Sequence, residues 1–446
     1  MIKIAGYGNR ISGENAAVKM KDASFPKPFP GGLEYNSPVH GTWNIVHTGM
    51  QVPEAIQIYV CAKNCMRGVV LTAAEMKAAD RFSFVILEEK DILNGNLEDI
   101  TIEGVADVLQ KRKDHPKAVL LFTVCLHHFM GSSLDYIYRS LEKRFPNICF
   151  LRCYMDPIMQ KEGLTPDQKL RKAMYDPMPL CKEDRAVSIL GSDFPLDEES
   201  DMKRLLGKYN IPVRELPGSK KWQELLDMGK SSLFLNIYPA GKYGMQEQAK
   251  RLKRKGMYLP ASFDYEEIED QLKKMTDALG LPQLSRQELD AERFCCEDAF
   301  KKAKEEIGDT PIALDYTYHP RTLGLAKLLI RHGFLVKEVY LDSFNPEERS
   351  EFFWLKEYAP DLEILATNQP QMRIFPRKRE EKWLAIGQKA AYFCGSPYFV
   401  NLVQGEGMYG FEGIRKTAEL MIEAFREEKD TKRLVIQKGW GCESCL

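Results

Sequence analysis

The stretches Ile56-Gln-Ile-Tyr-Val-Cys-Ala-Lys-Asn-Cys65 and Ala118-Val-Leu-Leu-Phe-Thr-Val-Cys125 decide the fold. Each is a short apolar run, rich in β-branched and aromatic residues, and each predicts a strand that ends in a thiol. In an open α/β sheet, ligands bind where loops leave the carboxyl ends of the strands. Thiols at that edge can hold a soft metal or an iron–sulfur cluster if a further ligand comes from elsewhere. The alternative is a set of buried structural thiols.

Similar runs recur along the chain and alternate with helical patterns. The expected strands cover 56–61, 82–87, 118–124, 148–154, a run opening at 186, 211–215, 232–238, 311–315, 335–341 and 362–366. The expected helices include 102–113, 134–144, 198–209, 322–332 and 346–358. This alternation predicts an α/β protein with three successive Rossmann-like domains, each built on a parallel sheet.

The expected domains are 1–185, 186–308 and 309–446. The first includes a Gly/Pro-rich arm at the amino end, which we expect to wrap a surface, and the third includes the carboxyl tail. The charged stretch 265–307 predicts a connecting pair of solvated helices.

Composition limits the classes of function. With 446 residues, 44% of them hydrophobic, the chain can form two or three cores. Its 63 basic and 64 acidic side chains give no basic excess, which argues against a nucleic-acid binder. No apolar run approaches the ~20 residues that a membrane span needs, and the amino end lacks the core of a signal peptide. We therefore expect a cytoplasmic protein.

Eleven cysteines in a reducing compartment are not expected to form a disulfide framework. Cys149, Cys153 and Cys394 lie at the ends of predicted strands or helices and are expected to be buried. Near the terminus, Cys442 and Cys445 form a Cys-x-x-Cys pair that could bind a metal or exchange disulfides with a partner, although a frayed terminus is the alternative. No phosphate-binding glycine motif is present, so no nucleotide site of the usual kind is expected.

Four segments resemble, in order, parts of the nitrogenase component 1-like superfamily, which includes the nitrogenase catalytic subunits and the dark-operative tetrapyrrole reductases. They are Pro53–Gly68, Val119–Asp135, Gly191–Leu206 and Gly407–Arg415. The first two are similar to the family's strands that lead into cluster-ligating cysteines. The chain is identified as a divergent member, and the resemblance implies an iron–sulfur cluster of the [4Fe–4S] type.

By this resemblance, Cys65 and Cys125 take the places of two cluster ligands. The family's first cluster cysteine should lie upstream of Cys65, where this chain offers His40 but no cysteine. Cys61 supplies an additional thiol four residues before Cys65. The expected ligand set is therefore Cys61, Cys65 and Cys125, and His40, a carboxylate, a partner residue or the substrate could fill the remaining position.

The resemblance also concerns a second metal cofactor. In nitrogenase that cofactor is held by a cysteine after a second-domain strand and by a histidine in a late glycine-rich turn. Ala240 and Tyr409 fall at or beside these positions here. Because alanine has no ligating atom, we do not expect dinitrogen reduction, and the identity of any second metallocofactor stays open.

Several polar residues are candidates for catalysis. His127 and His128 follow Cys125 directly and could tune a cluster or donate protons, although a solvated loop is the alternative. His319 and Arg321 follow a strand of the third domain, where they could bind a substrate anion or cap a helix. Tyr409 is the fourth catalytic candidate.

These inferences predict a nitrogenase-like oxidoreductase component. It would pair with itself or with a homologous subunit, accept electrons from an ATP-dependent iron–sulfur reductase, and reduce an unknown substrate. The first alternative is a scaffold on which an iron–sulfur or organometallic cofactor is assembled. The second is a small-molecule-binding α/β protein with structural cysteines.

Overall fold

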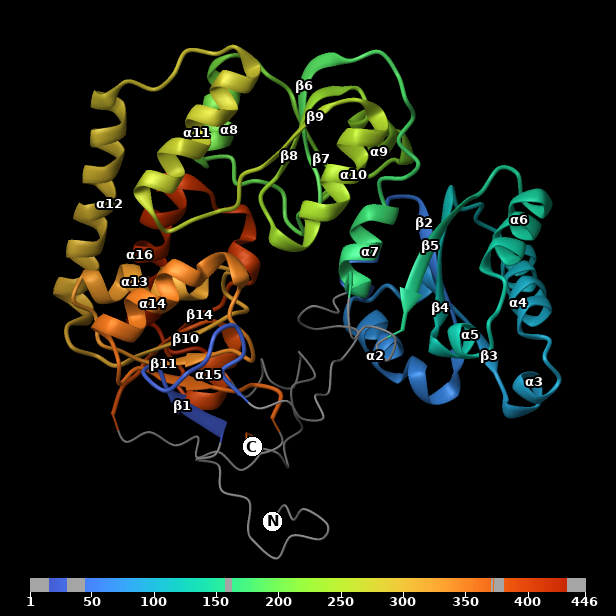
Figure 1. Ribbon diagram of the computed structural model, residues 1–446, viewed down its shortest axis with the longest axis horizontal. Helices are drawn as coiled ribbons and strands as arrows, with labels where there is room; N and C mark the ends of the chain where they lie inside the picture. The colour runs from blue at the N-terminus through green and yellow to red at the C-terminus, as the bar shows by residue number, and fades with distance from the viewer. Residues whose placement is uncertain (1–15, 30–44, 157–162, 370–371, 373–380, 431–446) are drawn as a thin grey trace, which may run out of the picture. The chain divides into compact units, whose positions relative to one another are not determined.

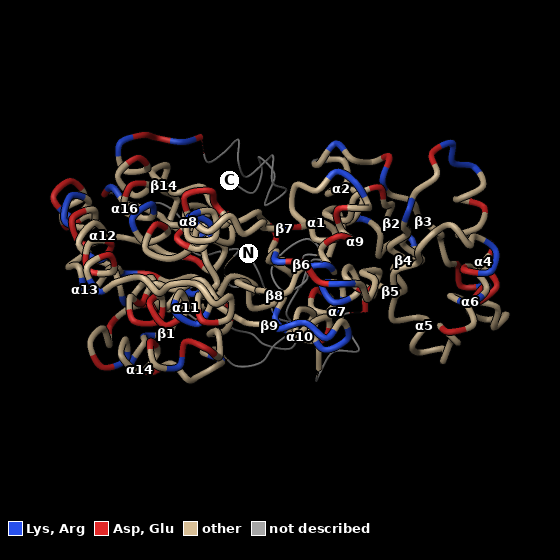
Figure 2. The backbone as a smooth tube through the Cα atoms, turned by 90° about the horizontal axis from the view of Figure 1, so that it is seen from above, with Lys and Arg blue, Asp and Glu red and all other residues tan. Residues whose placement is uncertain are grey.

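The chain divides into two compact units, which are described separately. The computed structural model describes residues 16–29, 45–156, 163–369, 372 and 381–430 (Figure 1). The two-sheet unit is built from described residues within 36–195 and 210–260, and the one-sheet unit from those within 1–35, 196–209 and 261–446. Acidic and basic residues are interspersed over both units, in line with the balanced net charge (Figure 2).

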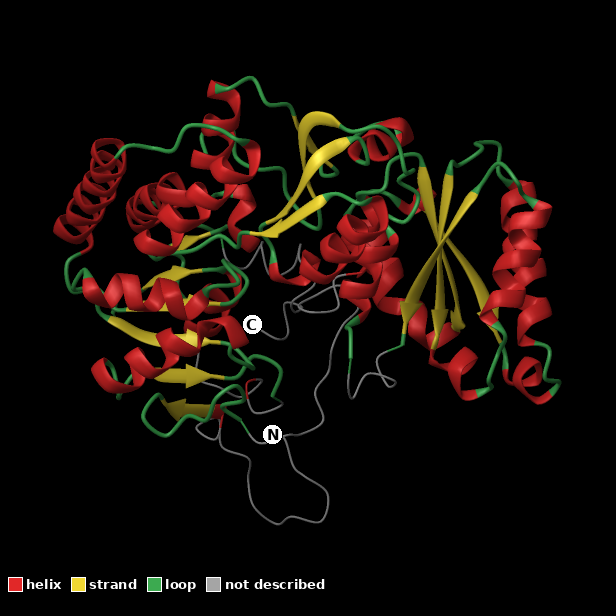
Figure 3. Cartoon of the chain, turned by 45° about the horizontal axis from the view of Figure 1, so that its top comes forward, coloured by secondary structure: helices red, strands yellow, loops and turns green. Residues whose placement is uncertain are grey.

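The first sheet of the two-sheet unit has four parallel strands in the order β3-β2-β4-β5. These are β2 (Ala55–Ala62), β3 (Phe82–Leu87), β4 (Ala118–Val124) and β5 (Cys149–Met155). Helices cover both faces of the sheet (Figures 1 and 3). They are α4 (Leu97–Lys111) and α6 (Leu134–Arg144) on one face, and α1 (Ile45–Met50) and α7 (Pro166–Ala173) on the other. Three short helices follow the carboxyl ends of β2, β3 and β4, namely α2 (Arg67–Glu75), α3 (Glu89–Leu93) and α5 (Cys125–Phe129).

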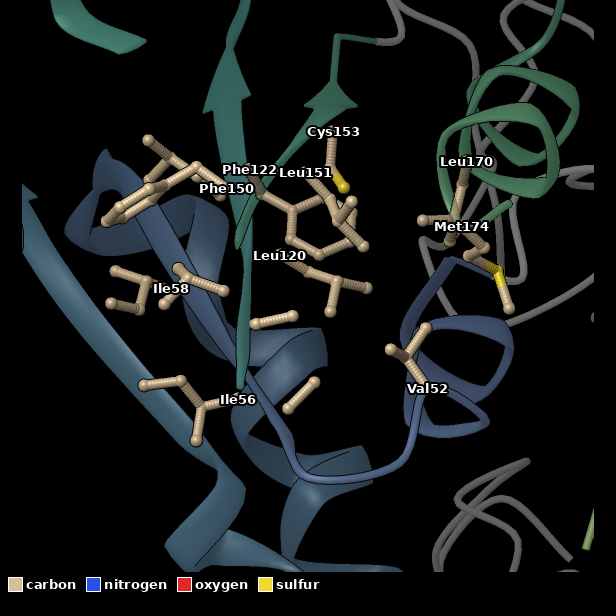
Figure 4. Close-up of a cluster of buried hydrophobic side chains, with 14 of the residues drawn as sticks. Val52, Ile56, Ile58, Leu120, Phe122, Phe150, Leu151, Cys153, Leu170 and Met174 are labelled. Carbon is tan, nitrogen blue, oxygen red and sulfur yellow. The ribbon is translucent and has the colours of Figure 1, made fainter. Parts of the chain in front are cut away.

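The strands β2 and β4 are almost continuously buried because helices cover both faces of the sheet. Tyr59 stacks on Phe122 with ring centroids 4.3 Å apart, and its hydroxyl donates to Gln57 Oε1 at 2.7 Å. Figure 4 shows Cys153 projecting toward Leu170 in the core between the sheet and α7. Apolar packing therefore fixes the strands that lead to the thiols, and within it the Gln57 amide donates to the Val46 carbonyl at 3.1 Å.

The second sheet of this unit has the parallel order β7-β6-β8-β9. Its strands are β6 (Asp184–Ile189), β7 (Val213–Glu215), β8 (Ser231–Asn236) and β9 (Lys255–Tyr258), and its helices are α9 (Trp222–Met228) and α10 (Lys242–Leu252). The first turns after β6 and β8 pack backbone to backbone. A Cβ on Gly191, whose φ is +83°, would lie 2.5 Å from the Cα of Gly241, so this contact requires glycine.

A buried arginine links α7 to the loop after β6. Arg171 Nη1 donates to the Gly191 carbonyl at 2.8 Å, and Nη2 donates to Asp193 Oδ2 at 2.8 Å. Nε donates to Asp167 at 3.1 Å. Arg171 and Asp167 are both fully buried, so this network belongs to the interior of the two-sheet unit.

The one-sheet unit contains a six-stranded sheet in the order β1-β12-β11-β10-β13-β14. Its strands are β1 (Ala17–Lys19), β10 (Ile312–Asp315), β11 (Val336–Tyr340), β12 (Glu363–Leu365), β13 (Leu384–Ile386) and β14 (Phe399–Val400). All pairs are parallel except that β1 runs antiparallel to β12. The helices of this unit are α8 (Asp201–Lys208), α11 (Tyr265–Leu279), α12 (Arg286–Ile307), α13 (Thr322–Arg331), α14 (Arg349–Tyr358), α15 (Gln388–Cys394) and α16 (Gly410–Arg426).

The three sheets confirm the predicted α/β class with parallel sheets in succession. The charged stretch 265–307 forms the expected helix pair, but α12 also buries Phe300 and packs along α16. The domain boundaries at 185 and 308 stay a prediction. Among the described residues, no helix combines the length and apolar character needed to cross a membrane.

Candidate functional site

Two of the predicted thiols lie at the carboxyl edge of the first sheet. Cys65 lies in the 3-10 turn Lys63–Met66 directly after β2, and Cys125 is the first residue of α5, directly after β4. Because β2 and β4 are parallel neighbours, with Tyr59 paired to Phe122, both strands deliver their cysteines to the same edge. The sequence prediction that these thiols lie where loops leave the sheet is confirmed.

The two thiols are close enough to influence each other. Cys65 is exposed, and Cys125 is half-buried. The pKa of the Cys125 thiol is raised, first by burial and then by the neighbouring Cys65 thiol. An exposed thiol beside a half-buried one gives soft donors that a metal group could reach from outside the core.

Cys61, the third thiol of the predicted set, lies in a different environment. It is completely buried and belongs to the core cluster that includes Tyr59 and Cys153. Burial, with a smaller contribution from Cys65, raises the pKa of the Cys61 thiol to about 12. Within the described part of the chain, no three His, Cys, Asp or Glu residues converge closely enough to hold a single metal ion.

His127 is a structural residue of the α5 turn. Thr101 Oγ1 donates to the Leu97 carbonyl and lies 3.1 Å from His127 Nε2, while the Val124 N–H donates to His127 Nδ1 at 3.3 Å. These contacts assign the ring proton to Nε2, which donates to Thr101. Burial lowers the pKa of His127 to about 4, so the imidazole is neutral near pH 7.

His128 has a different surrounding from its neighbour. It is half-buried, its ring stacks on Tyr154 with centroids 6.0 Å apart, and its Nδ1 lies 3.2 Å from Asp156 Oδ2. Asp156 directly follows β5 and is completely buried. Lys169 Nζ lies 3.8 Å from the same oxygen. The sequence analysis missed Asp156, although its position at a strand end on the ligand edge was a usable signal.

The candidates in the one-sheet unit are buried and are held by hydrogen bonds and an ion pair. His319 Nδ1 accepts the Arg321 N–H at 3.0 Å, and burial lowers the pKa of His319 to about 3. The Arg321 guanidinium donates to Glu267 at 3.1 Å. Tyr409 is buried, and its hydroxyl donates to Gln271 Oε1 at 2.5 Å. His40, Cys442 and Cys445 lie outside the described residues.

The succession of three sheets, with two thiols at the edge of the first, can be compared with known proteins. A model of the nitrogenase component 1 type oxidoreductase family matches residues 47–426. The chain belongs to this family. The predicted resemblance is confirmed, and the thiol edge of this component 1-type protein lies within the matched residues.

Two solved structures of nitrogenase Cp1 share the fold. The structure at pH 6.5 has a TM-score of 0.64 at 15% identity and covers 89% of this chain and 94% of its own. The structure at pH 5 has a TM-score of 0.58 at 11% identity and covers 96% of both chains. These identities are low, so the likeness establishes the architecture. No curated protein matches the sequence.

Proposed function

We propose that this component 1-type chain is the iron–sulfur component of a nitrogenase-like reductase. It accepts electrons from an ATP-dependent iron–sulfur reductase and reduces a substrate other than dinitrogen. The observation that carries the proposal is the pair Cys65 and Cys125, delivered by neighbouring parallel strands to one sheet edge and close enough to raise the pKa of Cys125.

The residues at this edge fit an iron–sulfur cluster of the [4Fe–4S] type. Thr123, two residues before Cys125, has a buried hydroxyl with no hydrogen-bond partner among the described residues. Such a hydroxyl can donate to a cluster sulfur and tune its potential. When bound, the cluster supplies one-electron transfer.

Exposed apolar side chains at the same edge support a second subunit, either identical or homologous. Phe129 and Met130, at the end of α5, are 57% and 46% exposed, and Leu93, at the end of α3, is 79% exposed. Apolar side chains that gather on one exposed edge are typical of a protein interface. A partner seated there would cover Cys65 and could supply the remaining cluster ligand. His40 stays a candidate for the same position.

By the resemblance, Ala240 and Tyr409 stand at or beside the two positions that hold the nitrogenase cofactor in the family. Ala240 lies in the 3-10 turn Pro239–Gly241 after β8 and has no ligating atom. The Tyr409 hydroxyl donates to Gln271, and burial raises the Tyr409 pKa strongly. Both residues argue against a nitrogenase-type cofactor attached in the same way. The substrate is therefore a different one.

The missing thiol at position 240 also favours a second candidate function. A scaffold on which an iron–sulfur or organometallic cofactor is assembled must release its product, and release requires weak attachment. Turnover separates the two functions. Substrate reduction with reductase and ATP supports the enzyme, whereas transfer of labelled iron to an acceptor without turnover supports the scaffold.

Anaerobic purification tests the cluster directly. We expect a brown protein with about four iron atoms per site and an electron paramagnetic resonance signal after dithionite reduction. Cys65→Ala and Cys125→Ala should lose this signal. Cys149→Ala is the matched control, because Cys149 lies at the amino end of β5, on the opposite edge of the sheet. An iron-free protein after cluster reconstitution would refute the proposal.

A further inference from the structure

The thiol edge of the first sheet carries fewer cysteines than a [4Fe–4S] cluster needs. Cys65 and Cys125 lie there, after neighbouring parallel strands. Such a cluster is usually held by four cysteine thiolates. Cys149 is no candidate, because it lies at the amino end of β5, on the opposite edge. The following cysteines of the described residues lie outside the first sheet and its short helices: Cys181, Cys295, Cys296 and Cys394.

Cys61 and Cys153 belong to the core on the α7 side of the sheet (Figure 4). Tyr59 pairs with Phe122, and Phe122 pairs with Cys153, all within their strands, so these side chains share one face. Cys61 lies two residues after Tyr59 in the same strand and shares that face. Both thiols are completely buried, and both contribute to the raised pKa of Tyr59 after burial. The described part of one chain therefore offers two thiols at the edge.

Exposed apolar side chains lie at the same end of the sheet as these two thiols. They belong to the short helices α2, α3 and α5 and to the end of β3 (Figure 1). Their exposed fractions run from 36% to 79%, and they are Val70, Leu71, Ile86, Leu93, Phe129 and Met130. Apolar side chains gathered on one exposed surface are typical of an interface with another chain. A partner seated there would cover Cys65, which is itself exposed.

The turn that carries Cys65 is basic. Lys63 and Arg67 flank this thiol in the chain, and both are exposed. Two copies that met at this turn would bring like charges together, which is unfavourable. A cluster held by four thiolates carries a net negative charge and would offset these basic side chains. The charge of the edge therefore suits an interface between two copies that contains the cluster.

We propose that two copies of this chain hold one [4Fe–4S] cluster between them, and that each copy supplies Cys65 and Cys125. This inference rests on the proposed function and names the partner and the ligands of the same site. A cube-shaped cluster has two-fold axes of its own, so it can lie on the axis of a symmetric dimer with two irons bound to each copy. A second copy brings the two missing thiols and an equal apolar surface, so the set of ligands is complete without Cys61.

Iron content and sedimentation velocity of the full-length protein, purified anaerobically, test this sharing. We expect a dimer with about two iron atoms per chain. About four iron atoms per chain, in a monomer or in a dimer, would contradict the inference and leave the proposed function intact. A wild-type protein without iron after cluster reconstitution contradicts the proposed function instead, so the two failures are distinguishable.

Phe129→Glu separates sharing from dimerisation alone, because it changes no ligand. We expect a folded monomer, as judged by circular dichroism, with less than about a tenth of the wild-type iron, because each copy then keeps two thiols. Phe353→Glu is the matched control, since Phe353 is 51% exposed on α14 of the one-sheet unit. The control should keep the dimer and its iron. A folded, monomeric Phe129→Glu protein with the wild-type iron content overturns the inference.

Mixed dimers carry the test if Phe129→Glu does not fold or stays dimeric. A copy with Cys65→Ala and Cys125→Ala is produced together with a wild-type copy that carries a different tag, and the mixed dimer is isolated through both tags. Shared ligation predicts almost no iron and no cluster signal in electron paramagnetic resonance, because only two thiols remain. Half of the wild-type iron with half of the signal means separate clusters and overturns the inference. A mixed dimer with Cys149→Ala in one copy is the control and should keep the wild-type iron content.

Discussion

Replacement of Arg171 by methionine should strongly destabilise the two-sheet unit. The guanidinium forms ion pairs with Asp167 and Asp193 and donates to the Gly191 carbonyl, with all three donor–acceptor distances between 2.8 and 3.1 Å. Methionine approximates the volume of the arginine stem but has no donor. The variant therefore leaves two carboxylates and one carbonyl in the interior without their cation.

The expected loss follows from this geometry. Removal of one partner from a buried ion pair costs about 3–5 kcal/mol, because the remaining charge stays buried and uncompensated. The carboxylates of Asp167 and Asp193 already repel each other in the wild type. The pKa of Asp167 is raised first by burial and also by Asp193, and Arg171 opposes this rise. We expect a loss of about 4 kcal/mol, and at about 2–4 °C per kcal/mol for a unit of this size the melting temperature should fall by about 8–16 °C.

Urea unfolding followed by far-UV circular dichroism measures this loss. Lys172→Met is the matched control, because Lys172 is the next residue of α7 and its ion pair with Asp176 is half-exposed. The control should lose less than about 1 kcal/mol. Adding Asp193→Asn to Arg171→Met should recover part of the stability. If Arg171→Met and Lys172→Met lose similar amounts, the reasoning about burial is wrong.

Three further predictions concern single residues. The His127 pKa of about 4 lies below the ordinary value of 6.5, so the unfolded chain binds this proton more strongly, and the free energy of unfolding should fall by about 3 kcal/mol as the pH drops from about 6.5 to 4. In His127→Gln the midpoint of urea unfolding should depend less on pH across this range. The same pH dependence in the variant and the wild type would contradict the assignment. Gly191→Ala should lower the free energy of unfolding by more than about 1 kcal/mol, because its Cβ would meet Gly241. Gly207→Ala in α8, where the Cβ meets no atom within 4 Å, should be neutral or stabilising in the same urea unfolding experiment. Phe129→Glu should weaken self-association or pairing with a homologous subunit, measured by sedimentation velocity, and an unaltered assembly would argue against a subunit at this edge.

The longer strands of the fold could be predicted because their apolar runs are uninterrupted. β2 and β4 are buried on both faces, and such strands leave a clear signal in the sequence. The three-residue strand β1 could not be predicted, since it is too short to show a period and is defined by pairing with β12, far along the chain. The helix α10 was missed as well, because its polar and basic residues mask the buried positions of Met245 and Leu252.

The candidate site was predictable in its location but not in its detail. The rule for parallel sheets places Cys65 and Cys125 at one edge, and the structure confirms that placement. The difference between His127 and His128 depends on Thr101, which reaches His127 from α4, a contact that no local pattern encodes. Asp156 has the same relation to β5 as Cys125 has to β4. The sequence analysis allowed a carboxylate ligand in general but did not single out Asp156.

Under the proposed function, the parallel sheet would allow the electron-accepting edge to be kept while other sites change. Each candidate ligand belongs to a separate strand-to-loop junction, so one ligand can be replaced without moving the strands that deliver the others. At Ala240 and Tyr409, which the resemblance sets at or beside the cofactor ligands of nitrogenase, the structure has a methyl group in a tight turn and a buried hydroxyl bonded to Gln271. Restoring a thiol at position 240 alone would leave Tyr409 engaged, so Ala240→Cys should not by itself create a second metal site. Equal iron content in Ala240→Cys and the wild type is therefore the expected result, and additional iron bound at the introduced thiol would contradict this account.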